Sequence, residues 1–455
     1  MTKSRAPVSA ARRPWRRALL AAALSVATGG FLATAPVASA APSVTTVQMV
    51  FWPGPEGTAM QQVVNHYNAT IGERDGIRVK QILLSRTSTF SKEATLIAAR
   101  SSEFDVYFTA SYIVGQQLPS LQPLTGVQAK YYFPSAPKSL SVDGKLYAVP
   151  LDVSNHFLYY RKDLMSKLLT DPAWKADYAK VSKQLLGKAL TPKPPAQWNW
   201  NDFLAAGAFF TKHLNPASPT TYGLAMQLEN LEFNVMIWDD VLWSLGGRWT
   251  NAKGQPDINT PAALKAMNIY RTTYVDHLTS PDSDAAEYPQ TEAALCSGRA
   301  AIALQWSAGF PELTSPKQCP QVAGKIAITH IPGPAHLTHV HVLGDALNRY
   351  SRHKAAAIKW LDYLATPQAM LLYARAGGIP SMPSVLLKVA NTQPAGYYQT
   401  IISTVEHGGF SEPTLPETQT IYVDLASDLS GAWAGLTSSK AALAKAQRDL
   451  EALIG

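Results

Sequence analysis

The chain has 455 residues, with 40 Lys and Arg, 32 Asp and Glu and 10 His, and a formal net charge of +8. Six of the basic residues and no acidic residue lie within residues 1–40, so the remaining 415 residues carry a net charge of only +2. This near-neutral balance excludes a strong sequence-independent attraction to nucleic acid. A chain of 415 residues is longer than one hydrophobic core accommodates, so two domains are predicted. None of its apolar runs approaches the roughly 18 residues that span a bilayer.

Residues 1–40 have the composition of a cleavable signal peptide. An apolar run begins at Ala18, and the small residues Ala38-Ser39-Ala40 follow it. The basic residues all precede the apolar run: Lys3, Arg5, Arg12, Arg13, Arg16 and Arg17. This order predicts export with cleavage near Ala40, and therefore a periplasmic or secreted protein. A retained membrane anchor is the alternative, and the choice between the general secretory and twin-arginine routes stays open.

The two cysteines, Cys296 and Cys319, both lie beyond the predicted leader. In an exported chain, two thiols at this separation predict one disulfide, with two buried free thiols as the alternative. No cysteine stands at the end of the leader, so the sequence does not indicate lipid attachment there.

The first part of the exported chain alternates strand and helix patterns. A strand is expected from Thr45, then a helix whose inner face carries Met60, Val63, Val64 and Tyr67 at helical spacing. A second strand over 77–84, a helix and a third strand over 104–108 follow. This alternation predicts a parallel sheet with right-handed crossovers. Ligands of such sheets bind beyond the carboxyl ends of the strands.

Further along, Asp143-Gly144 predicts a tight turn between two short extended runs. The segment 157–160 predicts a strand, and 200–203 predicts the start of a helix capped by Asn201 or Asp202. The segment 440–454 is rich in Ala, Leu, Lys and Glu and predicts a terminal helix.

The order of several short segments resembles the family 1 extracellular solute-binding proteins, the sugar receptors of ABC importers of the maltose-binding-protein type. The similarity extends over most of residues 45–385. Each segment is weak by itself, and their number and order carry the resemblance. The segments are Phe104-Asp105-Val106-Tyr107, Val142 to Pro150, Tyr159 to Leu164, Trp198 to Phe203, Glu292 to Ala301, Lys354 to Pro367 and Gly377 to Pro380.

The resemblance implies an α/β fold of the two-lobe periplasmic-binding-protein type (type II), with discontinuous lobes joined by a hinge. We expect lobe 1 to comprise 41–152 and 336–378, and lobe 2 to comprise 153–335 and 379–455. The chain segments that cross between the lobes are expected near 151–155, 331–337 and 378–383.

The function that the resemblance implies is an exported receptor, monomeric and without catalytic activity. It would bind a sugar in the cleft and deliver it to the permease subunits of an ABC importer. A receptor for a polyol, a glycerol phosphodiester or a peptide is the alternative. A secreted glycoside hydrolase is a more remote one, because that chemistry needs two carboxylates across the scissile bond.

Aromatic side chains are the first candidates for the binding site, since a sugar presents flat C–H faces that rings cover. Trp52 and Tyr112 follow the first and third predicted strands, and Trp306 follows a strand over 300–305, where the resembled family often carries a ring against the ligand. Trp238 and Trp243 share one predicted helix, where packing in the core is the stronger interpretation.

Polar candidates supply the hydrogen bonds that replace water around sugar hydroxyls. Asp152 and Asn155 lie at the first predicted crossing, whereas Asp105 could equally cap or turn the chain and Glu56 could simply favour a helix N-terminus. The full polar set is Glu56, Asp105, Ser111, Asp152, Asn155 and Gln305.

Four histidines fall within twelve residues: His330, His336, His339 and His341. His339 and His341 share a strand face at a spacing that metal ligands use. A polar crossing segment with one or two histidines touching the ligand is the preferred interpretation, so no metal and no cofactor are predicted.

Overall fold

The computed structural model describes residues 44–333 and 335–455. The predicted signal peptide lies outside these residues. No helix within residues 44–333 and 335–455 combines the length and the apolar character that crossing a bilayer requires. Cys296 and Cys319 form the predicted disulfide.

The strands belong to one branched sheet and one small hairpin. Their bounds are β1 Thr45–Phe51, β2 Ile77–Leu83, β3 Val106–Ala110, β4 Leu121–Gln122, β5 Ser141–Val142, β6 Lys145–Leu146, β7 Ala148–Arg161, β8 Tyr222–Ala225, β9 Ala300–Trp306, β10 Ile326–Thr329, β11 Thr338–Asn348 and β12 Gly409–Phe410. The hairpin β5–β6 turns at Asp143 and Gly144, which both have positive φ, as the tight-turn prediction requires.

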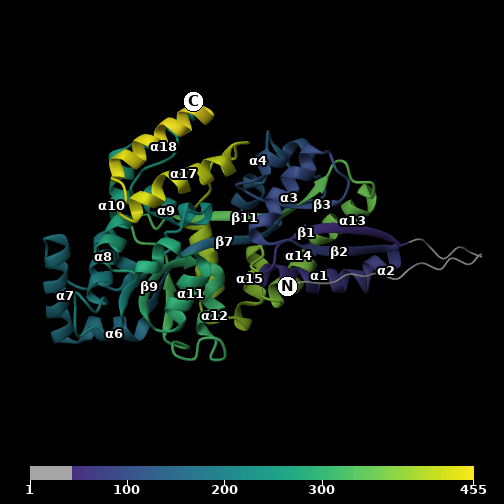
Figure 1. Cartoon of the computed structure of the whole chain (residues 1–455). Helices are drawn as coiled ribbons and strands as arrows, with labels where there is room; N and C mark the ends of the chain where they lie inside the picture. The colour runs from purple at the N-terminus through teal and green to yellow at the C-terminus, as the bar shows by residue number, and fades with distance from the viewer. Residues whose placement is uncertain (1–43, 334) are drawn as a thin grey trace, which may run out of the picture. The chain divides into compact units, whose positions relative to one another are not determined.

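Helices surround both ends of the sheet (Figure 1). In the first part they are α1 Pro55–Asn68, α2 Ile71–Asp75, α3 Arg86–Ala98, α4 Val114–Gln117, α5 Ser135–Ser139, α6 Lys162–Thr170, α7 Pro172–Leu186, α8 Trp200–Phe209 and α9 Glu232–Ser244. In the second part they are α10 Pro261–Val275, α11 Tyr288–Cys296, α12 Phe310–Thr314, α13 Lys354–Leu364, α14 Pro367–Arg375, α15 Pro383–Lys388, α16 Tyr397–Gly408, α17 Thr418–Trp433 and α18 Ser439–Ile454.

The alternation predicted for the first part is confirmed. Strand β1 pairs in parallel with β2 on one side and β3 on the other. The predicted inner face of α1 is buried, from Met60 to Tyr67. Gly57 allows this helix to start close to the strand, because a Cβ there would lie 2.3 Å from the carbonyl oxygen of Trp52. The helix start therefore lies directly beside the carboxyl end of β1.

The opposite end of the sheet has a parallel pair of its own, β8 with β9. The cap predicted for α8 at Asn201 or Asp202 was wrong by two or three residues. Asn199 is the N-cap, and its side chain accepts hydrogen bonds from the backbone of Asn201 and Asp202. Asp202 returns a bond to the Asn199 backbone, which completes a capping box. The predicted terminal helix is α18.

Two long strands connect these two parts of the sheet, and the strand order is β2-β1-β3-β11-β7-β9-β8. In Figure 1, β7 and β11 run between the two groups of helices. Residues 148–155 of β7 pair with β11, whereas residues 156–161 pair with β9 and β10. The predicted crossing at 151–155 therefore lies where β7 changes its partners, and the expected lobe boundaries stay a prediction.

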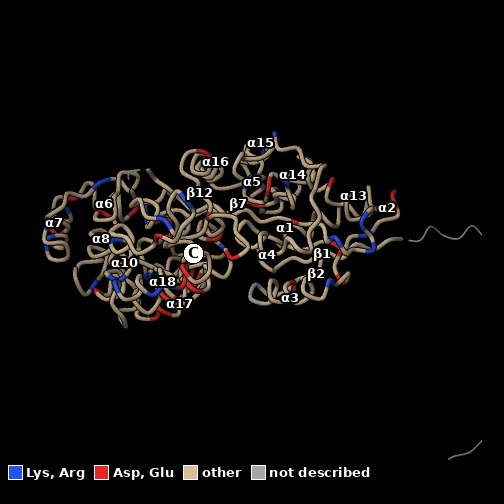
Figure 2. Tube along the Cα trace, turned by 90° about the horizontal axis from the view of Figure 1, so that it is seen from above, with Lys and Arg blue, Asp and Glu red and all other residues tan. Residues whose placement is uncertain are grey.

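Charged residues of both signs are interspersed along the described chain (Figure 2). This distribution agrees with the small net charge of the chain beyond residue 40.

Candidate functional site

Aromatic side chains gather at the carboxyl ends of β1 and β3. Trp52 follows β1 directly, and its ring centroid lies 4.7 Å from that of Phe108 and 6.2 Å from that of Phe90. The Phe90 ring in turn lies 5.8 Å from the ring of Tyr112, which follows β3. The structure thus brings together the two aromatic residues predicted in this part of the chain.

His341 of β11 joins these rings to the second part of the sheet. Its ring centroid lies 5.7 Å from that of Tyr112 and 4.9 Å from that of Trp306, the last residue of β9. Tyr112 also meets Phe233, at the start of α9, at 6.3 Å. We call these six residues the ring set: Trp52, Phe90, Tyr112, Phe233, Trp306 and His341.

The ring set draws side chains from both parts of the sheet around one crossing strand. Tyr112, Trp306 and His341 are nearly fully buried, with at most 6% of each exposed. Phe90 and Phe233 were not among the candidates from the sequence, and His341 was covered only by the expectation that one or two histidines of its segment touch the ligand. His341 carried a usable signal, because it alternates with His339 on a strand expected to lie at a lobe crossing.

Two of the predicted carboxylates, Glu56 and Asp152, lie near each other at the crossing. Asp152 Oδ2 accepts hydrogen bonds from the Tyr373 hydroxyl and the Ile379 backbone N–H, both at 2.8 Å. Burial raises the pKa of Asp152 well above its usual range, and the negative charge of Glu56 adds to this. Burial, then Asp152 and then Glu56, likewise raise the pKa of Tyr373.

Asp152 also fastens a third chain segment to β7. It forms an isolated antiparallel bridge with Pro380, and Val153 N–H donates to the Ile379 carbonyl at 2.9 Å. The third predicted crossing, near 378–383, therefore lies against the first.

A buried polar network lies beside the ring set, and His339 is at its centre. His339 Nε2 lies 2.5 Å from Glu412 Oε2, and Ser111 Oγ donates to Glu412 Oε1 at 2.8 Å. The backbone N–H of His339 donates to Asp240 at 2.6 Å, and Asp240 also contacts His156 Nδ1 at 2.8 Å. We call these five residues the histidine network: Ser111, His156, Asp240, His339 and Glu412.

The histidine network contains carboxylates in contrasting electrostatic environments. Burial raises the pKa of Asp240 well above its usual range. Burial acts on Glu412 in the same direction, but the charge and hydrogen bond of His339, helped by Ser111, hold the pKa of Glu412 below its usual range. Ser111, predicted as a ligand contact, therefore has a structural partner.

The structure does not bring Asp105 together with the ring set. Asp105 precedes β3, at the opposite end of the strand from Tyr112. Its carboxylate accepts hydrogen bonds from Gln48 N–H at 2.8 Å and Ser351 Oγ at 2.6 Å. It ties β1 and the segment after β11 to the start of β3, which fits the structural alternative.

Gln305 and Asn155 flank Trp306 and are engaged with their neighbours. Gln305 Oε1 accepts from Gln227 Nε2 at 2.7 Å, and its Nε2 donates to the Tyr288 carbonyl at 3.2 Å. Asn155 Nδ2 donates to the carbonyl of His156 at 3.3 Å. Gln305 precedes Trp306 in the chain, and Asn155 precedes His156, whose ring lies 4.1 Å from that of Trp306; each already has a protein partner.

The two tryptophans of α9 lie apart from the ring set. Trp238 is fully buried, and its ring lies 6.3 Å from that of Trp433. Trp243 stacks on Phe410 with ring centroids 4.8 Å apart and an interplanar angle of 8°. Both contacts favour the core-packing interpretation of these residues.

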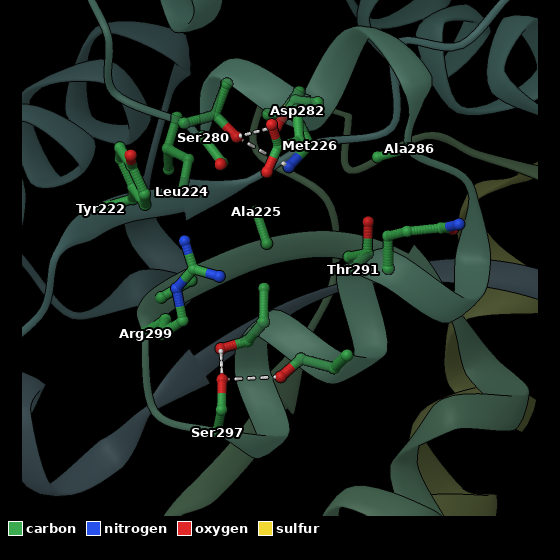
Figure 3. Close-up of a pocket in the computed structure, with 16 residues that line it drawn as sticks. Tyr222, Leu224, Ala225, Met226, Ser280, Asp282, Ala286, Thr291, Ser297 and Arg299 are labelled. Atoms are coloured by element: carbon green, nitrogen blue, oxygen red, sulfur yellow. Dashed lines mark hydrogen bonds between the residues drawn. The ribbon is translucent and has the colours of Figure 1, made fainter.

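Two sizeable cavities contain neither Trp52, Tyr112 nor Trp306. One of about 410 Å³ runs along β8 from Tyr222 to Ala225 and beside α11, with Arg299 at one side (Figure 3). The other, of about 770 Å³, is lined by Trp243, Phe410 and residues of three further segments. Because ligands of parallel sheets bind at carboxyl strand ends, we place the candidate site at the ring set.

The histidine pair with metal-ligand spacing does not form a metal site. The ring centroids of His339 and His341 are 6.1 Å apart, and His339 Nε2 is engaged with Glu412. Within residues 44–333 and 335–455, no group of three or more His, Cys, Asp or Glu side chains is placed to hold a metal ion.

Comparison with known proteins places this geometry in a family. The model of the family described as bacterial extracellular solute-binding protein matches residues 52–371. A solved structure of maltose-bound MalE3 from T. maritima has a TM-score of 0.75 and 20% identity, covering 90% of this chain and 100% of that one. This likeness confirms the predicted two-lobe α/β fold.

Curated relatives match this chain at low identity and over different shares of its length. A putative binding protein of Brucella abortus is 26% identical over 226 residues, 49% of this chain and 47% of the relative, so the match spans about half of each protein. The mannitol-binding protein of Pseudomonas aeruginosa is 23% identical over 400 residues, 82% of this chain and 85% of the relative. Since the family model covers well over half of its residues, the chain belongs to the bacterial extracellular solute-binding proteins.

Proposed function

We propose that this protein is an exported receptor that binds a sugar or polyol at the ring set and delivers it to the permease subunits of an ABC importer. The observation that carries the proposal is the position of the ring set. Its residues come from both parts of the sheet and meet at strand carboxyl ends around His341. The names of the relatives, one mannitol-binding and one solved with maltose, support a hydroxylated ligand.

The chemistry of the site suits such a ligand. Trp52, Tyr112 and Trp306 offer ring faces for C–H surfaces, and Glu56 offers a carboxylate acceptor for hydroxyl groups. A charge-assisted hydrogen bond from a hydroxyl to a carboxylate contributes about 1.5–3 kcal/mol.

Binding would act by shifting a population between open and closed lobe arrangements. Contacts from both parts of the sheet favour the closed arrangement, and the crossing segments act as the hinge. In this proposal the lobes are 41–152 with 336–378 and 153–335 with 379–455. The closed form is the one that docks on the permeases, and the protein acts as a monomer in the periplasm.

The receptor leaves its ligand chemically unchanged. Glu56 and Asp152 lie near each other, yet Asp152 is fastened to Tyr373 and Ile379 in the hinge. A glycoside hydrolase needs both carboxylates aimed at the scissile bond, so this arrangement favours binding over hydrolysis.

Titration calorimetry tests the proposal, with mannitol, glucose, maltose, a glycerol phosphodiester and a tripeptide as ligands. We expect saturable binding of a sugar or polyol at one site per chain. Thin-layer chromatography of the recovered maltose should show no cleavage. Binding of the phosphodiester or peptide alone would contradict the ligand class, and a cleaved product would contradict the receptor.

A further inference from the structure

Glu292 is a buried acid on α11 whose side chain reaches the strand that ends in Trp306. Only 4% of the residue is exposed. Its Oε2 atom accepts a hydrogen bond from Gln305 Nε2 at 3.3 Å, whereas Oε1 has no hydrogen-bond partner among the described residues. A polar atom that is buried without a partner requires an explanation from its surroundings.

Gln305 connects Glu292 to the backbone of Trp306. The amide oxygen of Gln305 accepts from the Trp306 N–H at 2.9 Å and from Gln227 Nε2 at 2.7 Å. Its nitrogen donates to Glu292 and to the Tyr288 carbonyl. An amide whose oxygen and nitrogen each meet two partners is held in one orientation. Glu292 therefore helps to fix the amide that in turn holds the backbone at Trp306.

The chain that follows Trp306 packs directly on the same carboxyl group. A Cβ on Gly309 would lie 2.6 Å from Glu292 Oε2 and 3.1 Å from Oε1, so glycine is needed for this approach. The Tyr159 hydroxyl donates to the Trp306 carbonyl at 2.7 Å and holds the same segment from β7. A contact this close leaves no room for water between the carboxyl group and Gly309.

The surroundings of Glu292 favour its protonated form. Burial, and next the negative charge of Glu312, raise the pKa of Glu292 to about 8, and the hydrogen bond from Gln305 opposes them. Because the groups of this environment include no cation, an ionised Glu292 would be a buried charge without a positive partner. The titratable groups in question are Glu312 of α12, Tyr159 of β7, Tyr397 of α16 and Tyr288 of α11 itself.

We propose that Glu292 is a positioning residue of the ligand site, which holds Gln305 and the segment 307–309 in place beside Trp306 while it is protonated and releases them when it ionises. An ionised carboxylate needs water, and water reaches this one only when the segment at Gly309 moves away. The inference rests on the proposed function, because Trp306 belongs to the ring set. Ligand binding should therefore weaken in alkaline solution.

Fluorine NMR of the protein labelled with 5-fluorotryptophan tests the positioning without any ligand. The Trp306 resonance is assigned by its loss in Trp306→Phe. We expect it to shift with a midpoint near pH 8 in the wild type and to be independent of pH in Glu292→Gln, which keeps the side-chain shape and cannot ionise. Glu406→Gln, at an exposed position of α16, is the matched control and should titrate as the wild type does.

Calorimetry with mannitol and maltose at pH 7 and pH 9 measures the consequence for binding. Since the pKa of Glu292 is about 8, about one molecule in ten keeps its proton at pH 9, and the apparent affinity of the wild type should fall about tenfold from pH 7. Glu292→Gln should bind equally well at both pH values. A second variant, Glu312→Gln, changes an exposed side chain and should move the NMR midpoint to lower pH, because one opposing charge is removed.

The two measurements separate the positioning role from the proposed function. A Trp306 resonance that does not titrate in the wild type, or that titrates equally in Glu292→Gln, would overturn the role of Glu292. If Glu292→Gln does not fold, an unchanged midpoint in Glu312→Gln would overturn it as well. Absence of sugar and polyol binding at both pH values, together with the expected NMR transition, would instead overturn the proposed function and leave the positioning of Trp306 by Glu292 in place.

Discussion

His341 of the ring set and His339 of the histidine network lie two residues apart on β11, yet they make different kinds of contact. His341 meets rings from both parts of the sheet, whereas His339 meets the carboxylate of Glu412 and, through its backbone, Asp240. Ring contacts act through apolar area, which has no preferred direction. Buried charges instead depend on their protein partners, since an unpaired buried charge is costly.

This difference predicts a separation of effects. Substitutions in the ring set should lower the ligand affinity, whereas substitution of a comparable buried ring elsewhere should lower only the stability. Changes in the histidine network should lower stability first.

The largest effect is expected for Glu412→Gln. The variant keeps the side-chain shape but leaves the His339 ring without its charged partner. Losing a buried hydrogen bond to a charged carboxylate costs about 1.5–3 kcal/mol of unfolding free energy, to be measured by urea denaturation at pH 7. Glu406→Gln, an exposed site on α16, is the control and should stay within about 0.5 kcal/mol of the wild type.

The Glu412 carboxylate also gives a sign to the pH dependence. Its pKa is lower in the folded chain than its usual 4.5, so its contribution is present above that value and lost as the pH falls through the folded pKa. Glu412→Gln should therefore lose less stability than the wild type on acidification below about pH 4.5. Equal losses in both proteins would show that Glu412 is not the charged partner of His339.

A smaller effect, on affinity, is expected for Trp306→Ala. Removing the ring should weaken sugar or polyol binding by at least tenfold, or about 1.4 kcal/mol. Trp243→Ala is the matched control, because it removes a tryptophan of similar burial that stacks on Phe410 outside the ring set. Calorimetry should find its ligand affinity unchanged, although both variants lose some stability from the cavity they create. Equal loss of affinity in the two variants would remove the distinction between the regions.

The sequence was sufficient for the sheet and for the strand-end rings. Two local patterns are present in the structure as predicted. They are the helical spacing from Met60 to Tyr67 and the strand ends at Trp52 and Tyr112. The hydrogen-bond partners of Ser111 and Asp105 could not be predicted from the sequence. Ser111 bonds to Glu412, 301 residues away, and Asp105 to Ser351, 246 residues away. No local pattern distinguishes a carboxylate that awaits a ligand from one that is already satisfied by a distant segment.

The smallest expected effect, on stability, is that of Asp152→Asn, and it sharpens the contrast between the two buried carboxylates. Asp152 has a folded pKa raised above its usual 3.8, mainly by burial and then by Glu56, whereas that of Glu412 is lowered. For a raised pKa, ionisation of the unfolded chain draws stability down as the pH climbs from about 3.8 through the folded pKa. Asparagine cannot ionise, and its single carbonyl oxygen can still accept from Tyr373 and Ile379 as Oδ2 does. We therefore expect the variant to be at least as stable as the wild type at pH 7, with a flatter profile between pH 4 and 7 in urea unfolding. A large loss of stability at pH 7 would mean that the charge of Asp152 itself holds the crossing segments together. Asp152 and Glu412 would then stabilise the fold in the same way, and the contrast between them would be wrong.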